Sequence, residues 1–537
     1  MYSDKEQINI LTSLLVAHGV TKAVVCPGSR NAPIVHNLAE CGAIACYPIT
    51  DERSAGFYAL GMAQQNKGRV AVCVTSGTAL LNLAPAVAEA YYQRVPLVIV
   101  SADRPKAWIN QQDGQTLPQA DALGPLVKKA VSLPEGRDET ERWHCNRLVN
   151  EALLALDHHG AGPVHINVPL SEPLFRFNVE TLPAQRIIRR LVPRSVDSAD
   201  IHPLLTGFAQ ARRPLIVIGQ LPEGALPSDC IGRLASRAAV ISEVLSYAGG
   251  IQNADDLIAS LPNADTLLPD FILHLGGMLI GKNLKAFLRR ASKAEQWLVN
   301  ETGEVCDTFM HLTGMVESAP TAVLRCCLKT LPKEEAEEYA TLWNNASQTL
   351  QQQREQEELP FSEAAVVKHF EAQLTRASFP FRVHYANSLP VRLANRYAHH
   401  HVGCNRGVNG IEGSLSTAAG MSVGESGKVF CVIGDLSFFY DQNALWNRNL
   451  RGNFRILLLN NGGGGIFQQV QGMPSDALHR RLVCAEHTTH AEGICRQNDV
   501  HYLSACTTDE MKAGIDWLLN AESERPILLE CNLIPNQ

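Results

Sequence analysis

Two polar residues that follow apolar runs, an aspartate and an asparagine, have the clearest potential for chemistry in this sequence. Asp435 follows the run "KVFCVIG", and Asn461 follows "RILLLN" and precedes four glycines. A carboxylate, an amide oxygen and a nearby backbone carbonyl are hard oxygen donors that suit Mg²⁺, and phosphate oxygens can complete such a site. Glycines let the backbone take positive φ and approach a ligand closely. These residues therefore predict a metal–phosphate site.

Other interpretations of this stretch exist. No Lys-Ser or Lys-Thr pair follows the glycines, which argues against a Walker-type phosphate loop. The structural alternative is that Asp435 caps a helix and that the glycines form an unrelated flexible loop.

Neighbouring parallel strands would bring the two residues together. They are 461 − 435 = 26 positions apart, about one strand–helix–strand repeat. Both preceding runs are continuously apolar, as expected of parallel strands that are covered on both faces. In an open parallel sheet, ligands bind beyond the carboxyl ends of the strands, where helix N-termini favour phosphate.

The same alternation of short apolar strands and helical stretches recurs along the chain and predicts an α/β fold of three parallel-sheet domains. The expected units are 1–178, 195–332, a helical linker at 333–360, and 361–537. The linker contains a long polar stretch, which predicts a solvated helix. Residues 79–93 have a helical pattern. The expected strands are 22–26, 69–76, 96–102, 163–169, 213–220, 238–244, 270–276, 295–300, 382–388, 428–435, 455–461 and 526–532.

Composition narrows the class of protein. A chain of 537 residues with 45% hydrophobic and 19% charged residues is typical of a large, well-buried globular enzyme. A net charge of −7 argues against a nucleic-acid-binding surface, and no apolar stretch is long enough to cross a bilayer. The N-terminus is polar and acidic, so we do not expect it to be a signal peptide. Fifteen cysteines without a C-x-x-C pair indicate reduced thiols and a cytoplasmic protein.

The metal–phosphate pattern resembles the diphosphate-binding signature of thiamine-diphosphate enzymes. Gly434 and Asp435 match its Gly-Asp pair, and Leu436-Ser437 stands where many members have Gly-Ser. The resemblance implies thiamine diphosphate as cofactor, with Mg²⁺ or Mn²⁺. The implied metal ligands are Asp435, Asn461 and the backbone of Gly463.

Such enzymes need a glutamate that hydrogen-bonds the aminopyrimidine of the cofactor and so promotes ionisation of the thiazolium C2. Glu52, in "CYPITDERSAGFYALG", follows an expected strand and begins an expected helix. An acidic residue is common in a first helical turn for structural reasons alone. Together with the Asp435 signature and the turn that begins at Ser76, however, the functional interpretation is favoured. We expect a buried carboxyl with a raised pKa.

A more specific resemblance covers essentially the whole chain. The motifs "CPGSRNAP", "TDERSAGFYALG", "SADRP", "NRGVNGIEGSLSTAAG" and "VIGDLSFFYDQNAL" are similar to those of the 2-succinyl-5-enolpyruvyl-6-hydroxy-3-cyclohexene-1-carboxylate synthase family of menaquinone biosynthesis. The resemblance implies decarboxylation of 2-oxoglutarate and a 1,4-addition of the resulting carbanion to isochorismate. It also implies a homodimer or a dimer of dimers, with active sites shared between chains.

The family motifs also place individual residues. Each substrate carries two carboxylates, for which arginine is the best planar partner. The implied substrate-binding residues are Arg30, Arg104, Gln115, Lys282, Ser388, Arg392 and Arg406. The implied catalytic residues are Ser29, Arg30, Glu52, Gln115, Ser388 and Arg392. The implied cofactor-binding residues are Glu52, Ser76, Gly77, Asn409, Gly410, Ile411, Gly434, Asp435, Leu436, Ser437, Asn461, Gly463, Gly464, Ile466 and Phe467, with Ile411 as the apolar wedge that bends the cofactor.

One position departs from the family pattern. After Lys282 the family often has a second basic residue, whereas this chain has Asn283. The contribution of the middle domain to carboxylate binding therefore stays open. The alternative functions are another thiamine carboligase or decarboxylase of the acetohydroxyacid synthase type, and a non-catalytic binding protein that kept the fold.

Overall fold

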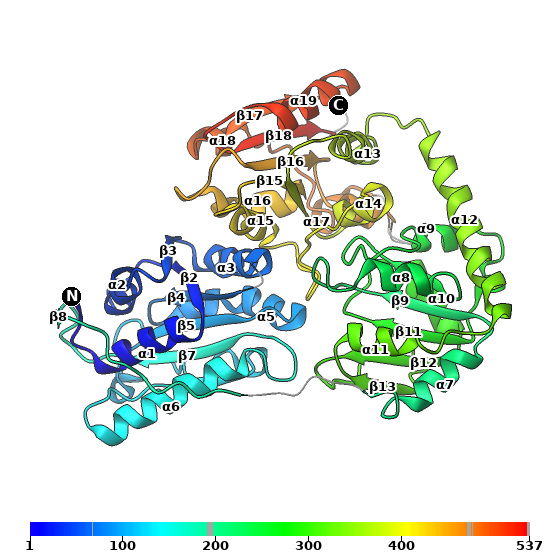
Figure 1. Ribbon diagram of the computed structural model, residues 1–537. Helices are drawn as coiled ribbons and strands as arrows, with labels where there is room; N and C mark the ends of the chain where they lie inside the picture. Colours follow the sequence, from blue (N-terminus) through cyan, green and yellow to red (C-terminus); the bar gives the residue numbers. More distant parts are fainter. Residues whose placement is uncertain (67, 191–196, 470–473, 475, 534–537) are drawn as a thin grey trace.

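The computed structural model describes residues 1–66, 68–190, 197–469, 474 and 476–533. Three α/β units are visible along the chain in Figure 1, coloured blue to cyan, green, and yellow to red. Residues 195 and 196, with which the second expected domain begins, and residues 534–537, with which the third ends, lie outside the described residues.

The first unit is built on a six-stranded parallel sheet in the order β3-β2-β4-β5-β7-β6. A short antiparallel pair, β1 with β8, joins the two ends of this unit. The strands are β1 Tyr2–Ser3, β2 Val20–Val25, β3 Ala45–Pro48, β4 Arg69–Val74, β5 Leu97–Asp103, β6 Ala130–Ser132, β7 Val164–Pro169 and β8 Phe177–Val179. The helices are α1 Glu6–Ala17, α2 Ala32–Glu40, α3 Glu52–Asn66, α4 Thr78–Asn82, α5 Ala84–Gln93, η1 Lys106–Trp108, η2 Gly124–Leu126 and α6 Glu139–Ala155.

The middle unit has a five-stranded parallel sheet in the order β10-β9-β11-β12-β13. Its strands are β9 Pro214–Ile218, β10 Ala239–Ser242, β11 Phe271–Leu275, β12 Glu295–Asn300 and β13 Gly314–Glu317. Its helices are α7 His202–Gln210, α8 Ser228–Leu234, α9 Ala254–Ser260, η3 Ala264–Leu267, α10 Lys282–Arg290, α11 Pro320–Cys327, η4 Glu334–Ala336 and α12 Glu337–Glu355.

The third unit has a five-stranded parallel sheet in the order β14-β15-β16-β18-β17. Its strands are β14 Phe381–Tyr385, β15 Lys428–Gly434, β16 Phe454–Asn460, β17 His501–Ala505 and β18 Ile527–Asn532. Its helices are α13 Glu363–Leu374, α14 Leu389–Tyr397, α15 Ser414–Ser422, α16 Asp435–Tyr440, η5 Gln442–Leu445, η6 Gly465–Gln469, α17 Ala477–Leu482, α18 Glu492–Gln497 and α19 Thr508–Asn520.

The three parallel sheets confirm the predicted fold class, because continuous apolar runs form their central strands. β15 and β16 pair directly, from Val429 opposite Phe454 to Gly434 opposite Leu459. Their carboxyl ends therefore meet at one edge of the sheet, as the spacing of Asp435 and Asn461 predicts. Local capping supports the helices: α19 begins with a capping box formed by Thr507 and Glu510.

Two helix predictions need correction. The helical stretch expected at 79–93 is divided into α4 and α5 at Leu83, because Pro85 in the first turn of α5 has no N–H to donate to the preceding turn. The long polar helix α12 is not solvated all round. Trp343 is completely buried, and Tyr339 donates a hydrogen bond of 2.8 Å to the carbonyl of Leu267, so one stripe of α12 belongs to the core of the middle unit.

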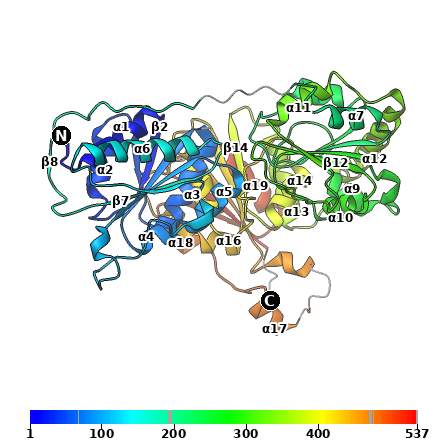
Figure 2. The same ribbon diagram turned by 90° about the horizontal axis from the view of Figure 1, so that it is seen from below.

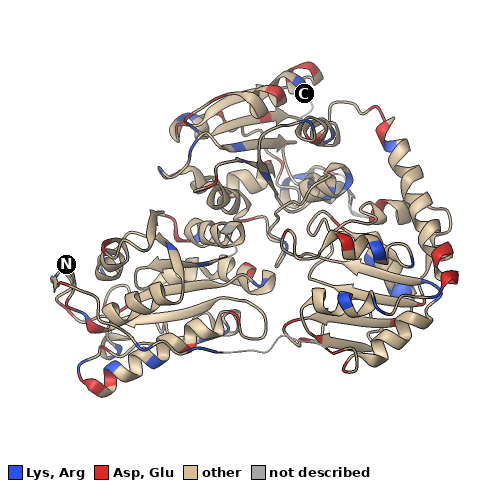
Figure 3. Cartoon of the chain, in the orientation of Figure 1, with Lys and Arg blue, Asp and Glu red and all other residues tan. Residues whose placement is uncertain are grey.

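The first and third units share one hydrophobic core. Residues of α3, such as Phe57 and Tyr58, pack with Leu415 and Ala418 of α15 in a single buried cluster. Figure 1 shows the two units meeting where α3 approaches the third unit, and Figure 2 shows the first and middle units on opposite sides of it. In Figure 3 most charged residues lie on helices and loops, whereas most strands contain few. Within the described part of the chain, no helix is both long and apolar enough to cross a membrane.

Two glycines permit the close crossing of α3 and α15. A Cβ added at Gly61 would overlap the carbonyl oxygen of Thr417, and one added at Gly420 would overlap that of Tyr58. We expect Gly420→Ala to destabilise the protein by about 1–3 kcal/mol. The added methyl group would collide with the backbone of α3 at Tyr58, and neither helix can move away without disturbing the core. The midpoint of thermal unfolding measures the effect.

Gly493→Ala is the matched control for this substitution. Gly493 lies in α18, is exposed, and has no atom within 4 Å of an added Cβ. We expect no loss of stability there, since alanine is the better helix former. Equal midpoints for the two variants would contradict the tight crossing.

Candidate active site at the sheet edges

Asp435 and the glycine loop meet at the carboxyl edge of the third sheet. Asp435 begins α16 and is almost completely buried. Its Oδ2 accepts a hydrogen bond of 2.9 Å from the N–H of Gly463, and its Oδ1 accepts one of 2.6 Å from the N–H of Leu436. Burial raises the pKa of Asp435, and these N–H groups and the nearby His487 oppose the rise. The carboxylate is thus held at the sheet edge by backbone groups of the loop.

The two consecutive asparagines have different roles. Asn460 is buried and donates a hydrogen bond of 2.6 Å to Glu530, so it holds the strand end in the core. Asn461 donates one of 2.7 Å from Nδ2 to Glu363. An ionised carboxylate can only accept hydrogen bonds, which fixes the amide orientation and turns Oδ1 towards the N–H of Gly463, 3.2 Å away.

The donor set at this edge fits a hard divalent cation. The oxygens of Asp435 and Asn461 both lie within hydrogen-bonding distance of one backbone group, the N–H of Gly463. Gly462 has φ 79° and Gly463 has φ 156°, so both rely on the conformational freedom of glycine. The loop continues through Gly464 into η6, which contains Ile466 and Phe467. These oxygens could hold Mg²⁺ together with phosphate oxygens.

A second loop carries the apolar residue expected to contact the cofactor. The carbonyl of Ile411 accepts a hydrogen bond from the hydroxyl of Ser437, two residues after Asp435. Asn387 donates one of 2.8 Å to the carbonyl of Gly410. The backbone of the loop is therefore anchored while the side chain of Ile411 stays 42% exposed. An anchored, exposed apolar side chain is what a wedge against a ligand requires.

Glu52 lies at the start of α3 in the first unit. Its Oε2 accepts a hydrogen bond of 3.1 Å from Asn82 of α4. The expectation of a buried carboxyl is wrong for the single chain, because Glu52 is only partly buried. Nearby, Gln119 accepts a hydrogen bond of 2.6 Å from the N–H of Gly77, and Ser76 is buried beside it.

The candidate substrate-binding residues form two groups. In the first unit, burial and the neighbouring Arg104 lower the pKa of Arg30, whose guanidinium pairs with Glu172 at 2.9 Å. Arg104 pairs with Asp113 at 3.3 Å. Ser29 and Gln115 are exposed on the same unit.

The second group lies between the middle and third units. Arg406 donates hydrogen bonds to Asn387 at 3.4 Å and to the carbonyl of Leu279 at 3.3 Å. Arg392 lies in α14, and Lys282 begins α10 and is exposed. Among the described residues, no hydrogen bond or ion pair joins this group to the first.

Backbone strain marks three of the candidate residues. Gln115, Ser388 and Asn409 have φ of 56°, 76° and 69°, a region that non-glycine residues seldom adopt. Such strain persists only where the surrounding structure imposes it, and it is frequent at ligand sites. It supports the candidate assignment independently of any motif.

Comparison with known proteins adds to this geometry. Three family models match the chain: "Thiamine pyrophosphate enzyme, N-terminal TPP binding domain" at residues 8–123, "Middle domain of thiamine pyrophosphate" at 195–381, and "Thiamine pyrophosphate enzyme, C-terminal TPP binding domain" at 388–531. Curated relatives from Bacteroides fragilis and Phocaeicola vulgatus are 46% and 43% identical, each covering 99% of this chain and 96% of the relative. One from Desulfotalea psychrophila is 34% identical over 99% of both chains.

All three relatives carry the name 2-succinyl-5-enolpyruvyl-6-hydroxy-3-cyclohexene-1-carboxylate synthase. The chain belongs to this synthase family. It is therefore an enzyme that depends on thiamine diphosphate, and the predicted family, enzyme class and organic cofactor are confirmed.

The structure of this synthase family member shows supporting residues that the motifs did not indicate. Glu89 of α5 accepts hydrogen bonds of 2.6 and 2.7 Å from the N–H groups of Gly407 and Val408. This residue of the first unit therefore holds in place the segment of the third unit that follows Arg406. Glu363 orients Asn461, and Nε2 of His487 lies 3.3 Å from Asp435. A single carboxylate in the apolar helix "APAVAEAYYQ" is a signal that could have indicated Glu89.

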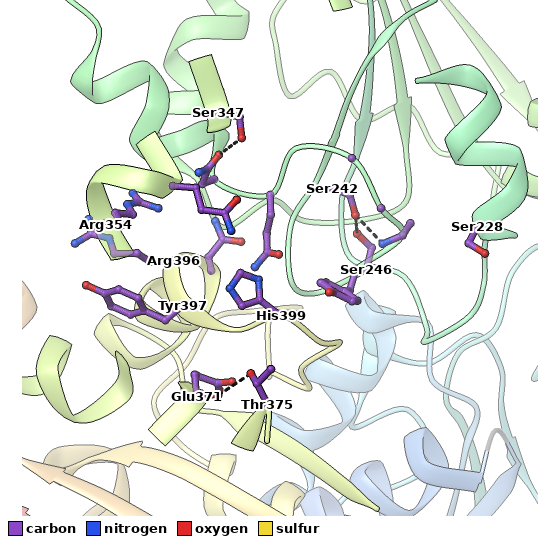
Figure 4. A pocket seen from close by; sticks show the side chains of 18 of the residues that line it. Ser228, Ser242, Ser246, Ser347, Arg354, Glu371, Thr375, Arg396, Tyr397 and His399 are labelled. Carbon is purple, nitrogen blue, oxygen red and sulfur yellow. Dashed lines mark hydrogen bonds between the residues drawn. The ribbon is translucent and has the colours of Figure 1, made fainter. Parts of the chain in front are cut away.

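A cavity of about 880 Å³ lies elsewhere, between the middle and third units of the synthase. In Figure 4, Arg354 and Arg396 lie side by side on its wall. Both guanidinium groups pair with Asp256, so their charges are already partly matched within the protein. The described residues that line this cavity include none of the predicted site residues.

Proposed function

We propose that this chain decarboxylates 2-oxoglutarate and joins the remaining four-carbon unit to isochorismate by 1,4-addition. The product is 2-succinyl-5-enolpyruvyl-6-hydroxy-3-cyclohexene-1-carboxylate, an intermediate of menaquinone biosynthesis. The observation that carries the proposal is the pair Arg392 and Arg406, which lie close enough for the charge of Arg392 to lower the pKa of Arg406. Neither forms an ion pair within the described part of the chain, and the Nε of each is buried without a hydrogen-bond partner. Such cations suit substrates with two carboxylates.

Different residues have different roles toward the cofactor and the metal. Thiamine diphosphate, when bound, supplies the centre that stabilises negative charge during decarboxylation and carbon–carbon bond formation. Glu52 would hold a proton for exchange with the aminopyrimidine ring. Asp435, Asn461 and the carbonyl of Gly463 would hold Mg²⁺ or Mn²⁺ together with the diphosphate, and the side chain of Ile411 would contact the cofactor. The wider cofactor contacts are those assigned to Ser76, Gly77, Asn409, Gly410, Gly434, Leu436, Ser437, Gly464, Ile466 and Phe467.

The substrate groups belong to the same proposal. The arginine clamps orient the carboxylates and so lower the entropic cost of bringing the two substrates together. The assigned substrate-binding groups are Ser29, Arg30, Arg104, Gln115, Lys282, Ser388, Arg392 and Arg406. We also propose a cytoplasmic location, on the basis of the cysteine usage.

Incubation of the purified protein with thiamine diphosphate, Mg²⁺, 2-oxoglutarate and isochorismate tests this function by product analysis. We expect the succinylated cyclohexene product and CO₂. Turnover of pyruvate alone would instead favour an enzyme of the acetohydroxyacid synthase type, and no turnover of either would favour a non-catalytic protein.

We further propose that two copies of the chain share each active site. Within one chain, the residue after Glu52 contacts the C-terminal end of α16, since Arg53 donates a hydrogen bond of 2.9 Å to the carbonyl of Tyr440. Asp435 lies at the opposite, N-terminal end of that helix. Glu52 and Ile411 are both partly exposed, and large apolar side chains are exposed near them, among them Leu81 and Val408. A second copy related by two-fold symmetry would cover these groups and could bring Glu52 to the Asp435 loop.

Complementation between inactive variants tests the shared site. We expect Glu52→Gln and Asp435→Ala to restore activity to each other when the two chains are co-expressed. A mixed dimer contains one site with both lesions and one with neither. Random mixing makes about half of the dimers mixed, so about a quarter of wild-type activity should return. Confirmed heterodimers without activity would mean that each site is built within one chain.

A further inference from the structure

A third cation lies beside Arg392 and Arg406, on α10 of the middle unit. The ammonium group of Lys285 donates a hydrogen bond of 3.3 Å to the carbonyl oxygen of Leu279. Arg406 donates to the same oxygen, also at 3.3 Å. The two cationic groups therefore share one neutral acceptor across the boundary between the middle and third units. Two positive charges are not normally placed together in this way without an anion nearby.

The pKa of Lys285 reflects its place beside the two arginines. Burial lowers the pKa of Lys285, the positive charges of Arg406 and Arg392 lower it further, and the carboxyl of Glu243 opposes the change. Lys285 is half-buried, and within the described residues it forms no ion pair. An ammonium group has three donors, and the single bond to Leu279 leaves two of them available.

The carboxylates near these cations are already engaged with backbone groups. Glu243 accepts hydrogen bonds of 2.5 and 2.8 Å from the N–H groups of Ile280 and Gly281. Burial raises the pKa of Glu243 to about 7, so near neutral pH it carries only part of a negative charge. Glu89 is bound by the N–H groups that follow Arg406. The cluster of Lys285, Arg392 and Arg406 thus keeps an excess of positive charge.

The position of Lys285 on α10 shows how the middle unit can supply a second basic group although position 283 is an asparagine. The side chain of Asn283 donates a hydrogen bond of 3.3 Å to Asp255 and so is directed to another part of the middle unit. Lys285 lies three residues after Lys282, which places the two lysines on the same helix face. The second basic group of this helix is therefore at Lys285, about one turn after Lys282, rather than at position 283.

We propose that Lys285 binds a carboxylate of one of the two dicarboxylate substrates, together with Arg392 and Arg406. This inference rests on the proposed function. Lys285 touches substrate and is a binding residue, so its removal weakens binding of one substrate more than it slows the chemical step.

Steady-state kinetics of Lys285→Met in the holoenzyme test the proposal, with each substrate varied while the other is saturating. Loss of a hydrogen bond between charged groups should raise the KM for 2-oxoglutarate or for isochorismate at least about ten-fold. We expect kcat to stay within about two-fold, because the bond is present before and during the reaction. Which KM rises identifies the substrate.

Two further variants separate binding from a structural role. Lys285→Arg should keep most of the affinity, because it preserves the charge. Arg289→Met is the matched control: Arg289 is an exposed cation one turn later on α10, and its Nε binds the carbonyl of Thr308. Its KM values should not change. The unfolding midpoint of Lys285→Met should equal that of wild type.

Unchanged KM values for both substrates in Lys285→Met, with an active wild type, would overturn the assignment of Lys285 alone. A fall in kcat together with a lower unfolding midpoint would show that Lys285 only holds the loop at Leu279. An inactive wild type under the same conditions would overturn the proposed function as well.

Discussion

Replacement of Glu52 by glutamine should nearly abolish turnover while the fold and the cofactor affinity are kept. Glutamine has the same shape and can still accept the hydrogen bond from Asn82, but it cannot exchange the proton that activates the cofactor. Proton transfer by a positioned side chain contributes about 10²–10⁴-fold to rate, and we expect a loss of that size in kcat. Turnover at saturating cofactor measures it, and cofactor titration by thermal shift checks that binding is intact.

Asp51→Asn is the matched control, because Asp51 is the adjacent carboxylate and has a structural role. It accepts hydrogen bonds from the N–H of Ser54 at 3.2 Å and from Asn443 at 2.8 Å. Asparagine can also cap the helix start, so activity should stay within a few-fold of wild type. Rates for Glu52→Gln within a few-fold of wild type would remove Glu52 from its catalytic role.

Replacement of Asp435 by alanine should remove activity through loss of the metal and the diphosphate. The change deletes one hard oxygen ligand and also the acceptor that holds the N–H of Gly463. Wild-type protein should gain thermal stability on addition of thiamine diphosphate and Mg²⁺, because a ligand that binds only the folded state stabilises it by mass action. Asp435→Ala should gain little.

Asp509→Asn controls for the change in charge within the same unit. Asp509 lies in the first turn of α19 and is exposed, far from any candidate ligand in the sequence. This variant should show the same cofactor-induced shift as wild type. An equal shift in Asp435→Ala would place the metal and the diphosphate elsewhere.

The predictions that succeeded depend on local patterns. Central strands of parallel sheets, such as β15 and β16, are continuously apolar because helices cover both faces, so they can be recognised residue by residue. The helix predictions were weaker. The break at Pro85 and the narrow buried stripe that contains Trp343 depend on one or two residues within otherwise regular or polar stretches.

The sequence by itself determined the fold class, the family and the cofactor, because these depend on residue types at short spacings along single strands and turns. Only the tertiary structure decided which side chains from distant elements interact with one another. Glu89 binds the backbone that follows Arg406, Glu363 orients Asn461, and Lys285 rather than Asn283 shares an acceptor with Arg406. These contacts join residues from different units or from separate elements of one unit. Their partners are selected by how the sheets and helices pack, and a linear pattern does not contain that information.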